Sequence, residues 1–197
     1  MLTFAEIYFK IYIGDEKMVL SYKDAISKYK SNYQLYNAIN NKELYKIEPG
    51  IYSDRECVNY LSVLNLKYPN AVFTSDSAYY YHNLTDVIPR KYFLSTLRKA
   101  SKINDSKVKQ VYTPDEKFDV GITQINIGGI EIKIYDKERI LIDLVNKSEK
   151  IPFDYYKEII NNYRETRDTL DMNKIVQYLS YYKNAEELFL KIQKEVF

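Results

Sequence analysis

The stretch from Ser31 to Tyr52, SNYQLYNAINNKELYKIEPGIY, predicts a helix followed by a β-hairpin. Ser31 can begin the helix because its hydroxyl can accept a hydrogen bond from a free backbone N–H of the first turn. A narrow apolar stripe at helical spacing follows, made of Leu35, Ala38 and Ile39. Pro49-Gly50 suits a type II turn, and we expect a loop longer than two residues because this turn fits poorly in a tight hairpin.

The helix face opposite the stripe is polar and almost uncharged. It carries Asn32, Tyr33, Gln34, Asn37 and Asn41. Asparagine and glutamine amides can both donate and accept hydrogen bonds. A polar helix that runs into a small hairpin is typical of the second half of a winged helix-turn-helix. In that design the helix enters the major groove and the hairpin lies on the phosphates.

The residues before Ser31 predict two further helices. The first covers residues 2–13 and presents an apolar face. The capping-box sequence Ser21–Asp24 then opens a second helix. Only Lys30 and Ser31 separate the second helix from the third, which is the turn length of a helix-turn-helix. The order of three helices and a hairpin predicts a winged-helix domain over residues 1–53.

This domain assigns roles to named side chains. Gln34 and Asn37 lie three positions apart on one face, so each amide can form a bidentate pair with N6 and N7 of adenine. The lysines around the helix have no geometry for reading bases and are expected to meet phosphates. The DNA-binding residues that we expect are Lys28, Lys30, Ser31, Tyr33, Gln34, Asn37 and Lys46.

Composition limits the function classes that fit the chain. Its 197 residues, with few glycines and prolines, are typical of one large or two small globular domains. The single cysteine, Cys57, excludes an internal disulfide and a cysteine-rich metal site, and its apolar neighbours predict a thiol in the core. The chain has no signal pattern and no apolar run of ~18 residues, so we expect a cytoplasmic protein. Because the net charge is only +2, nucleic-acid affinity must come from local patches.

The rest of the chain predicts a connecting helix over residues 54–69 and a C-terminal domain over residues 70–197. This domain begins with a short strand and a helix that Ser75 or Asp76 is expected to cap. A hairpin over residues 122–134 is indicated by alternating apolar residues around a primed Gly-Gly turn. Helices are then expected to begin at Asp136, Pro152, Asp171 and Asn184. The expected fold class is α+β, with an N-terminal winged helix-turn-helix followed by a mixed α/β domain with a helical tail.

Residues 90–110 hold the one strongly asymmetric block of charge. Clustered lysines and arginines bind phosphates electrostatically, so the block predicts a surface for an acidic partner, with nucleic acid the first candidate. A solubilising basic loop is the other interpretation. The basic patch expected to bind a partner is Arg90, Lys91, Arg98, Lys99 and Lys102.

The only histidine, His82, lies five positions after Ser77 on one predicted helix. Side chains at that spacing do not face each other, so the pair does not form a Ser-His dyad. We therefore expect His82 to have a structural role, bonding to a backbone or turn group.

Three segments carry a family resemblance: NAINNKELYKIEPGIYSD at residues 37–54, FTSDSAYYYHNLTDVIP at residues 73–89, and YDKERILIDL at residues 135–144. Together they resemble the AbiEi antitoxin family of abortive-infection toxin–antitoxin systems. The last segment is similar to the family's Tyr-Asp-x-Glu-Arg-x-x-x-Asp-Leu sequence. The three occur in the right order, between residues 37 and 144 of the 197.

The resemblance implies an antitoxin that binds inverted repeats in its own promoter through the N-terminal winged helix. It also implies a nucleotidyltransferase toxin as partner, counteracted through the C-terminal domain and without the need for a stable direct contact. We expect no enzymatic activity, no cofactor and no metal. Whether the protein is a monomer or a dimer on DNA stays open.

Two alternatives remain from the residues themselves. Glu131 and Lys133 form a Glu-x-Lys pair on a strand, with Pro114-Asp115 upstream, which is weakly similar to the signature of magnesium-dependent nucleases. The first alternative is therefore a DNA-binding nuclease of a phage-defence system. The second keeps the winged helix and makes the C-terminal half a sensor of a ligand or protein.

Overall fold

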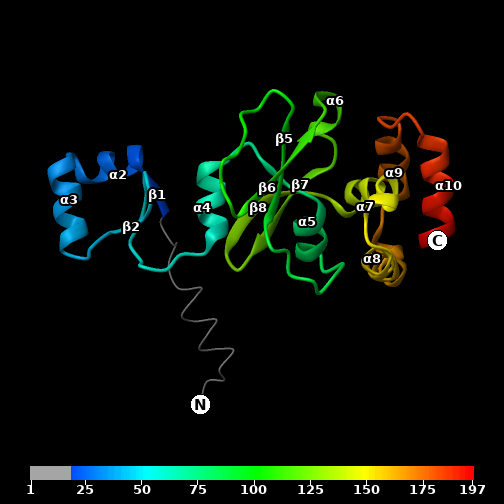
Figure 1. Cartoon of the computed structure of the whole chain (residues 1–197), viewed down its shortest axis with the longest axis horizontal. Coiled ribbons are helices and arrows are strands. Elements are labelled where there is room, and N and C mark those ends of the chain that lie inside the picture. Colours follow the sequence, from blue (N-terminus) through cyan, green and yellow to red (C-terminus); the bar gives the residue numbers. More distant parts are fainter. Residues whose placement is uncertain (1–18) are drawn as a thin grey trace, which may run out of the picture. The chain divides into compact units, whose positions relative to one another are not determined.

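The computed structural model describes residues 19–197, and the chain divides into two compact units (Figure 1). The first unit is Met1–Pro69 with Asn126–Glu131, and the second is Asn70–Ile125 with Ile132–Phe197. The helix predicted over residues 2–13 lies outside the described residues. In the described part, nine α-helices and two sheets confirm the mixed α+β class.

The first unit combines three helices with a three-stranded antiparallel sheet of order β1-β3-β2. Its elements are β1 (Val19–Ser21), α2 (Tyr22–Tyr29), α3 (Asn32–Asn40), β2 (Tyr45–Glu48), β3 (Ile51–Ser53) and α4 (Tyr60–Lys67). Buried apolar side chains from both helices of the α2–α3 pair and from the sheet form one core, made of Leu20, Ala25, Leu35, Ala38, Leu44 and Tyr52. The predicted capping box is present, because Ser21 and Asp24 bond to each other's backbone N–H.

The β2–β3 hairpin has a tighter loop than the sequence predicted. Glu48 pairs directly with Ile51, so Pro49-Gly50 is the whole loop. Gly50 has φ +78°, the left-handed value that a type II turn requires at this position. The register shifts between Lys46 and Glu48. Such an irregularity in one strand adds local twist, which accounts for a short loop that an ideal hairpin would not accept.

The sequence predicted that the segment after the hairpin is helical from Asp54. The helix begins only at Tyr60. The side chain of Asn59 caps α4 by accepting a hydrogen bond from the Leu61 N–H at 3.0 Å. Cys57 precedes this cap and is exposed, so the prediction of a core thiol is wrong. At its other end, α4 is tied to the hairpin by the Lys67–Glu48 ion pair, with 2.8 Å between Nζ and Oε2.

The second unit contains a five-stranded sheet of order β6-β5-β4-β8-β7, except for the end of its β7–β8 hairpin, Asn126–Glu131, which groups with the first unit. Its strands are β4 (Val72–Phe73), β5 (Tyr92–Leu97), β6 (Val108–Thr113), β7 (Ile122–Ile127) and β8 (Ile130–Tyr135). Strands β5 and β6 are parallel, and β4 is antiparallel to β5 and parallel to β8. Gly128 and Gly129 both have positive φ, which confirms the predicted primed turn between β7 and β8.

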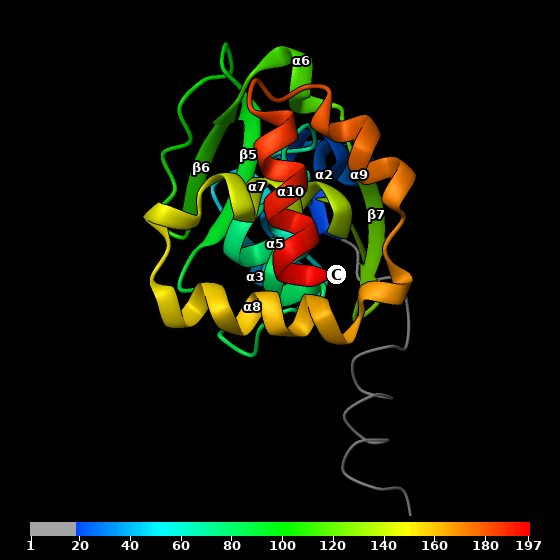
Figure 2. The ribbon, with the colours of Figure 1, turned by 90° about the vertical axis from the view of Figure 1, so that its right-hand side faces the viewer.

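Helices cover this sheet and form the tail of the chain (Figure 2). They are α5 (Ser75–Tyr81), α6 (Asp115–Phe118), α7 (Lys137–Asn146), α8 (Phe153–Glu165), α9 (Met172–Leu179) and α10 (Ala185–Val196), with short 3-10 turns at Ser148–Lys150 and Arg167–Thr169. Helix α5 packs against β5 and α7, and α10 packs against α7, α8 and α9. No helix in the described part is long and apolar enough to cross a membrane.

The starts of these helices test the local predictions. Asp136 and Asp171 cap α7 and α9 through their side chains, as predicted. Pro152 and Asn184 occupy the predicted starts of α8 and α10 without a side-chain cap bond. The cap predicted for α5 is wrong, because Thr74 is the N-cap and forms no side-chain cap bond, and the helix itself begins at Ser75. Thr74 has an extended backbone and is the single residue between β4 and the helix.

Candidate nucleic-acid interface

A tight corner joins α2 to α3 and sets the direction of α3. Lys30 adopts a left-handed conformation with φ 64°, and its N–H donates to the Ile26 carbonyl at 2.7 Å, which ends α2. Ser31 then caps α3, with its hydroxyl accepting from the Gln34 N–H at 3.2 Å. The prediction that Ser31 starts this helix is confirmed. The hydroxyl is thus engaged by the helix itself.

Helix α3 buries one face and presents the other. Leu35 and Ala38 are buried in the core of the first unit. On the outer face, Tyr33 is 74% exposed and Tyr36 is 63% exposed. Gln34 and Asn40 are exposed and Asn37 is half-buried. Helix α3 therefore presents a surface of amides and phenols.

Tyr36 was missed among the candidate residues of this face. It lies three positions after Tyr33, a spacing that places two side chains side by side on a helix. The three-residue spacing from Tyr33 could have identified Tyr36 from the sequence alone. Asn32, which was assigned to the face, is partly engaged, because the Tyr22 hydroxyl donates to its Oδ1 at 2.8 Å. In the described residues the side chains of Gln34 and Asn37 have no hydrogen-bond partner, so both amides are available.

Exposed lysines surround this face. Lys28 and Lys30 precede α3, and Lys46 lies on strand β2. Lys42 follows the end of α3, is exposed, and was not among the predicted residues. Among residues 19–197, no carboxylate pairs with any of these four lysines.

The nearby carboxylates have other partners. Asp24 accepts from the Ser21 hydroxyl at 2.5 Å, within the capping box. Glu43 accepts from the Asn41 amide at 3.4 Å, and Glu48 is paired with Lys67. The positive charge around α3 is therefore not neutralised by direct ion pairs.

In the second unit, the structure does not bring the predicted basic patch together. Arg90 and Lys91 precede strand β5, whereas Arg98, Lys99 and Lys102 follow it. A strand of this length spans about 20 Å, so the two groups lie at opposite ends of β5. All five side chains are exposed, and Lys99 lies 3.7 Å from the Asp115 carboxylate in a solvent-exposed pair.

The loop that carries Arg98, Lys99 and Lys102 is held to the sheet by one glutamine. Gln110, on β6, accepts from the Ile103 N–H at 2.8 Å through Oε1. Its Nε2 donates to the Thr96 hydroxyl at 2.8 Å and to the Ser101 carbonyl at 3.1 Å. These bonds of Gln110 fix the loop that carries Arg98, Lys99 and Lys102. Arg90 and Lys91, before β5, are not part of this loop.

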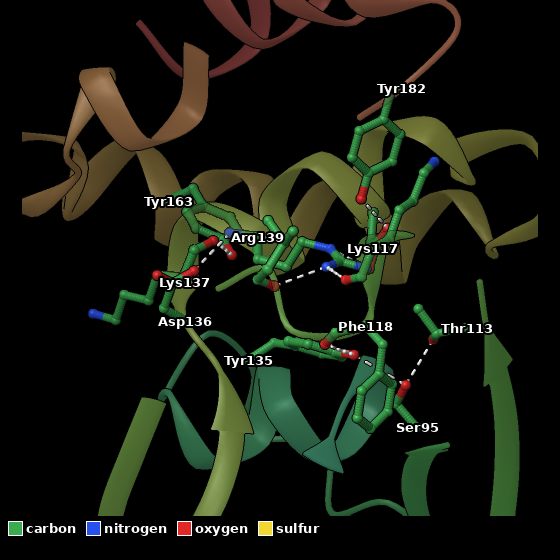
Figure 3. Close-up of polar contacts among 12 residues, drawn as sticks. Ser95, Thr113, Lys117, Phe118, Tyr135, Asp136, Lys137, Arg139, Tyr163 and Tyr182 are labelled. Atoms are coloured by element: carbon green, nitrogen blue, oxygen red, sulfur yellow. Dashed lines mark hydrogen bonds and ion pairs between the residues drawn. The ribbon is translucent and has the colours of Figure 1, made fainter. Parts of the chain in front are cut away.

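The segment YDKERILIDL forms the start of α7 and a buried polar network (Figure 3). Arg139 is only 2% exposed, and its Nη1 donates to the Lys117 carbonyl at 2.6 Å and the Val120 carbonyl at 2.8 Å. Its Nε lies 3.3 Å from the Asp143 carboxylate. Burial alone lowers the pKa of Arg139, but the charge of Asp143 raises it overall, so the guanidinium stays charged.

The other polar residues of this segment are also bonded inside the second unit. Asp143 accepts from the Tyr182 hydroxyl at 2.6 Å, and Asp136 accepts from the Tyr178 hydroxyl at 2.9 Å. Glu138 accepts from the backbone N–H of Asp171 at 2.9 Å. These bonds fasten α7 to the α9 helix and to the turn that follows it.

The base of α7 connects to the sheet through Tyr135. Its hydroxyl donates to the Phe118 carbonyl at 2.9 Å and lies 3.1 Å from the Ser95 hydroxyl. Gly121 packs so closely here that a Cβ would lie 2.6 Å from Arg139 Cβ and 2.9 Å from Asp136 Oδ1. Tyr135, Asp136, Glu138 and Asp143 of this segment therefore use their side chains to hold the fold together.

His82 has the structural role that the sequence predicted. Its Nε2 lies 2.8 Å from the Tyr135 carbonyl oxygen, at the base of α7. Burial lowers the pKa of His82, which favours the neutral ring that donates to this carbonyl. Ser77 is engaged elsewhere, because its Oγ accepts from the Phe93 N–H at 2.8 Å.

The residues of the nuclease alternative lie on exposed positions. Glu131 and Lys133 are exposed on β8, and Asp115 is exposed at the start of α6. Within residues 19–197, no group of three or more histidine, cysteine, aspartate or glutamate side chains lies close enough to hold a metal ion.

Comparison with known proteins adds no identification. No family model matches the chain, and no curated protein is similar to it.

Proposed function

We propose that the first unit is a winged helix-turn-helix that binds double-stranded DNA. Three features support this assignment: α2 and α3 meet at a corner of Lys30 and Ser31, α3 carries its own N-cap, and the β2–β3 hairpin follows α3 directly. In such a module the second helix of the pair enters the major groove and the hairpin lies along the phosphates.

The observation that carries the proposal is the surface of α3. Its outer face is uncharged, exposed and rich in amides, and the lysines without carboxylate partners lie around it rather than on it. Lysines that neutralise phosphates supply affinity that does not depend on sequence, whereas amides aimed at base edges supply specificity. A surface with both, in this arrangement, fits duplex DNA better than a protein partner.

We further propose that the protein represses its own promoter and acts as an antitoxin against a nucleotidyltransferase. This part rests on the resemblance of three sequence segments to the AbiEi family. Neutralisation would belong to the second unit. The similar α7 segment supports a shared fold rather than a shared reaction, because Asp136, Glu138, Arg139 and Asp143 all form hydrogen bonds within the second unit.

The DNA-binding part is tested by salt titration of the full chain on its own promoter duplex and on a scrambled duplex. A Lys28→Ala/Lys30→Ala/Lys46→Ala variant should bind both duplexes more weakly. Its slope of log affinity against log salt should be shallower by about 0.9 for each phosphate that is no longer neutralised.

The matched control removes three exposed lysines of the second unit, Lys150, Lys183 and Lys194. That variant has the same net charge as the first, so it should bind like the parent chain if the contacts are local. Equal losses in the two variants would assign the affinity to net charge and reject the interface.

The antitoxin part is tested by survival of cells that express a nucleotidyltransferase toxin, the partner that the resemblance implies. We expect Arg98→Ala/Lys99→Ala/Lys102→Ala to abolish rescue, because these cations share the loop that Gln110 holds to the sheet. Arg90→Ala/Lys91→Ala is the control from the other end of β5 and should retain rescue. Full rescue by the triple variant would remove the basic loop from the mechanism.

A further inference from the structure

Helix α3 lacks the side chains that most often read guanine. The commonest specific contact in the major groove is a bidentate bond from arginine or lysine to guanine O6 and N7. The α3 sequence, NYQLYNAIN, contains neither residue. The surrounding lysines lie before the helix, after it and on the hairpin, where they suit phosphates.

The same helix presents groups that suit both halves of an A·T pair. In the major groove adenine offers N7 and N6, which match an asparagine or glutamine amide, and thymine offers a C5-methyl group that accepts apolar contact. Gln34 and Asn37 supply free amides three positions apart. Tyr36 is one position before Asn37, about 100° around the helix from it, whereas Gln34 lies on the opposite edge of the outer face. Tyr36 is 63% exposed and supplies an apolar ring near the middle of the helix.

We propose that α3 reads A·T-rich sites, with Tyr36 contacting the C5-methyl group of a thymine while Gln34 and Asn37 bind adenines. The inference rests on the proposed DNA binding and adds the base preference and the residue that sets it. Tyr33 lies in the first turn, beside the capped end of the helix, where backbone N–H groups and the helix dipole favour phosphate. This position separates its role from that of Tyr36.

The experiment uses the full chain and a pool of duplexes with a randomised central segment. Repeated selection should enrich A·T pairs at the positions that bind α3. Each thymine of the selected duplex is then replaced, one at a time, by deoxyuridine. This replacement removes only the C5-methyl group and retains the base pair, the O4 acceptor and the backbone charge.

At one position or more, deoxyuridine should weaken binding by the parent chain about 4-fold, which corresponds to one buried methyl group at about 0.8 kcal/mol. In Tyr36→Ala the same replacement should have no further effect, because the contacting ring is absent. Tyr36→Phe keeps the ring and should remain sensitive. The deoxyuridine replacement and Tyr36→Ala form a thermodynamic cycle. A general loss of affinity in Tyr36→Ala affects both duplexes equally, so it is not mistaken for an interaction between the ring and the methyl group.

The outcomes separate the inference from the proposed function. Enrichment of G·C pairs, or an equal deoxyuridine effect in the parent chain and Tyr36→Ala, overturns the base preference while leaving DNA binding intact. Failure of the folded parent chain to bind any duplex in the pool, or its promoter, overturns the DNA-binding proposal and the inference with it. Circular dichroism of each variant verifies the fold.

Discussion

Helices α3 and α7 both combine polar and apolar side chains, yet they use their polar residues in opposite ways. In α7, Arg139 is buried and donates to the backbone carbonyls of Lys117, in α6, and of Val120, which follows that helix. In α3, Gln34 is exposed and its amide is not engaged by the described residues. The polar group of Arg139 stabilises the fold, whereas the amide of Gln34 is available to bind a partner.

The difference teaches that residue type alone does not identify a functional site. A charged residue in a motif suggests a catalytic role, but Arg139 and Asp143 form an ion pair and both bond to other residues of the fold. An uncharged amide attracts less attention, but a free and exposed amide can still form bonds with a ligand. The following four predictions test this contrast.

The largest expected effect is on stability, from Arg139→Ala. Removing the guanidinium leaves the Asp143 charge and two backbone carbonyls without their partner in a buried site, which typically costs about 3–5 kcal/mol of unfolding free energy. Urea unfolding of the full chain, followed by tyrosine fluorescence, measures the change. Arg98→Ala removes an exposed arginine and should stay within about 0.5 kcal/mol of the parent chain. Similar losses in both would erase the contrast between buried and exposed polar residues.

The next effect is on binding, from Gln34→Ala and Asn37→Ala. Each should cost about 1–3 kcal/mol on the operator duplex and hardly change binding to a scrambled duplex, because the amide reads bases and not phosphates. Fluorescence anisotropy on both duplexes measures the ratio. Gln177→Ala, at an exposed position of α9, is the control and should alter neither affinity. Equal losses on both duplexes would show that α3 is not the reading helix.

A smaller and mixed effect is expected from Lys30→Gly. Glycine adopts the left-handed backbone at this corner without steric cost, so the unfolding free energy should not fall and could rise by up to about 1 kcal/mol. Because one phosphate is then no longer neutralised, the salt slope should be shallower by about 0.9.

Lys28→Gly is the matched control for this change, since it removes the same charge from within α2. There glycine should lower stability by up to about 1 kcal/mol while reducing the salt slope equally. Thermal unfolding and salt titration of both variants provide the comparison. A drop in stability in Lys30→Gly would mean that the corner is not strained.

The smallest effect concerns pH and also separates the two regions. Burial lowers the pKa of His82 below its usual value of 6.5, so the unfolded chain binds a proton more readily than the folded chain. This contribution to stability is therefore present above pH 6.5 and is lost as the pH falls from 6.5 towards the folded pKa.

Urea unfolding at pH values from neutral down to about 5.5 measures this loss, and His82→Gln should remove it. Operator affinity should stay flat over the same range, because the described part of the first unit contains no histidine. A histidine-dependent change in affinity with unchanged stability would reverse this assignment.

Local features of the fold were predictable because neighbouring residues decide them. Ser31 and Asp136 cap their helices through side chains that reach backbone groups three residues away. Gly128 and Gly129 form the primed turn because only backbones without a Cβ readily take positive φ at consecutive positions. These features need no contact with distant parts of the chain.

Predictions that depended on distant contacts were less secure. A helix from Asp54 fitted the local apolar spacing, but the observed cap is Asn59, and Cys57 is exposed as a result. The five basic residues form one block in the sequence, but the extended strand β5 carries two of them away from the other three. Charge clustering along the chain was therefore a poor guide to clustering in space.

The sequence alone determined the α+β class, the principal caps and turns, and the polar face of α3, because each depends on periodicity or on bonds within a few residues. Only the tertiary structure decided which polar residues are buried and bonded within the fold and which are exposed. Arg139 is buried because the α6–β7 connection and Tyr182 close over it, and Tyr36 is exposed because no element of the described chain covers that side of α3. Burial depends on contacts between residues far apart in the sequence, and local pattern carries no information about them.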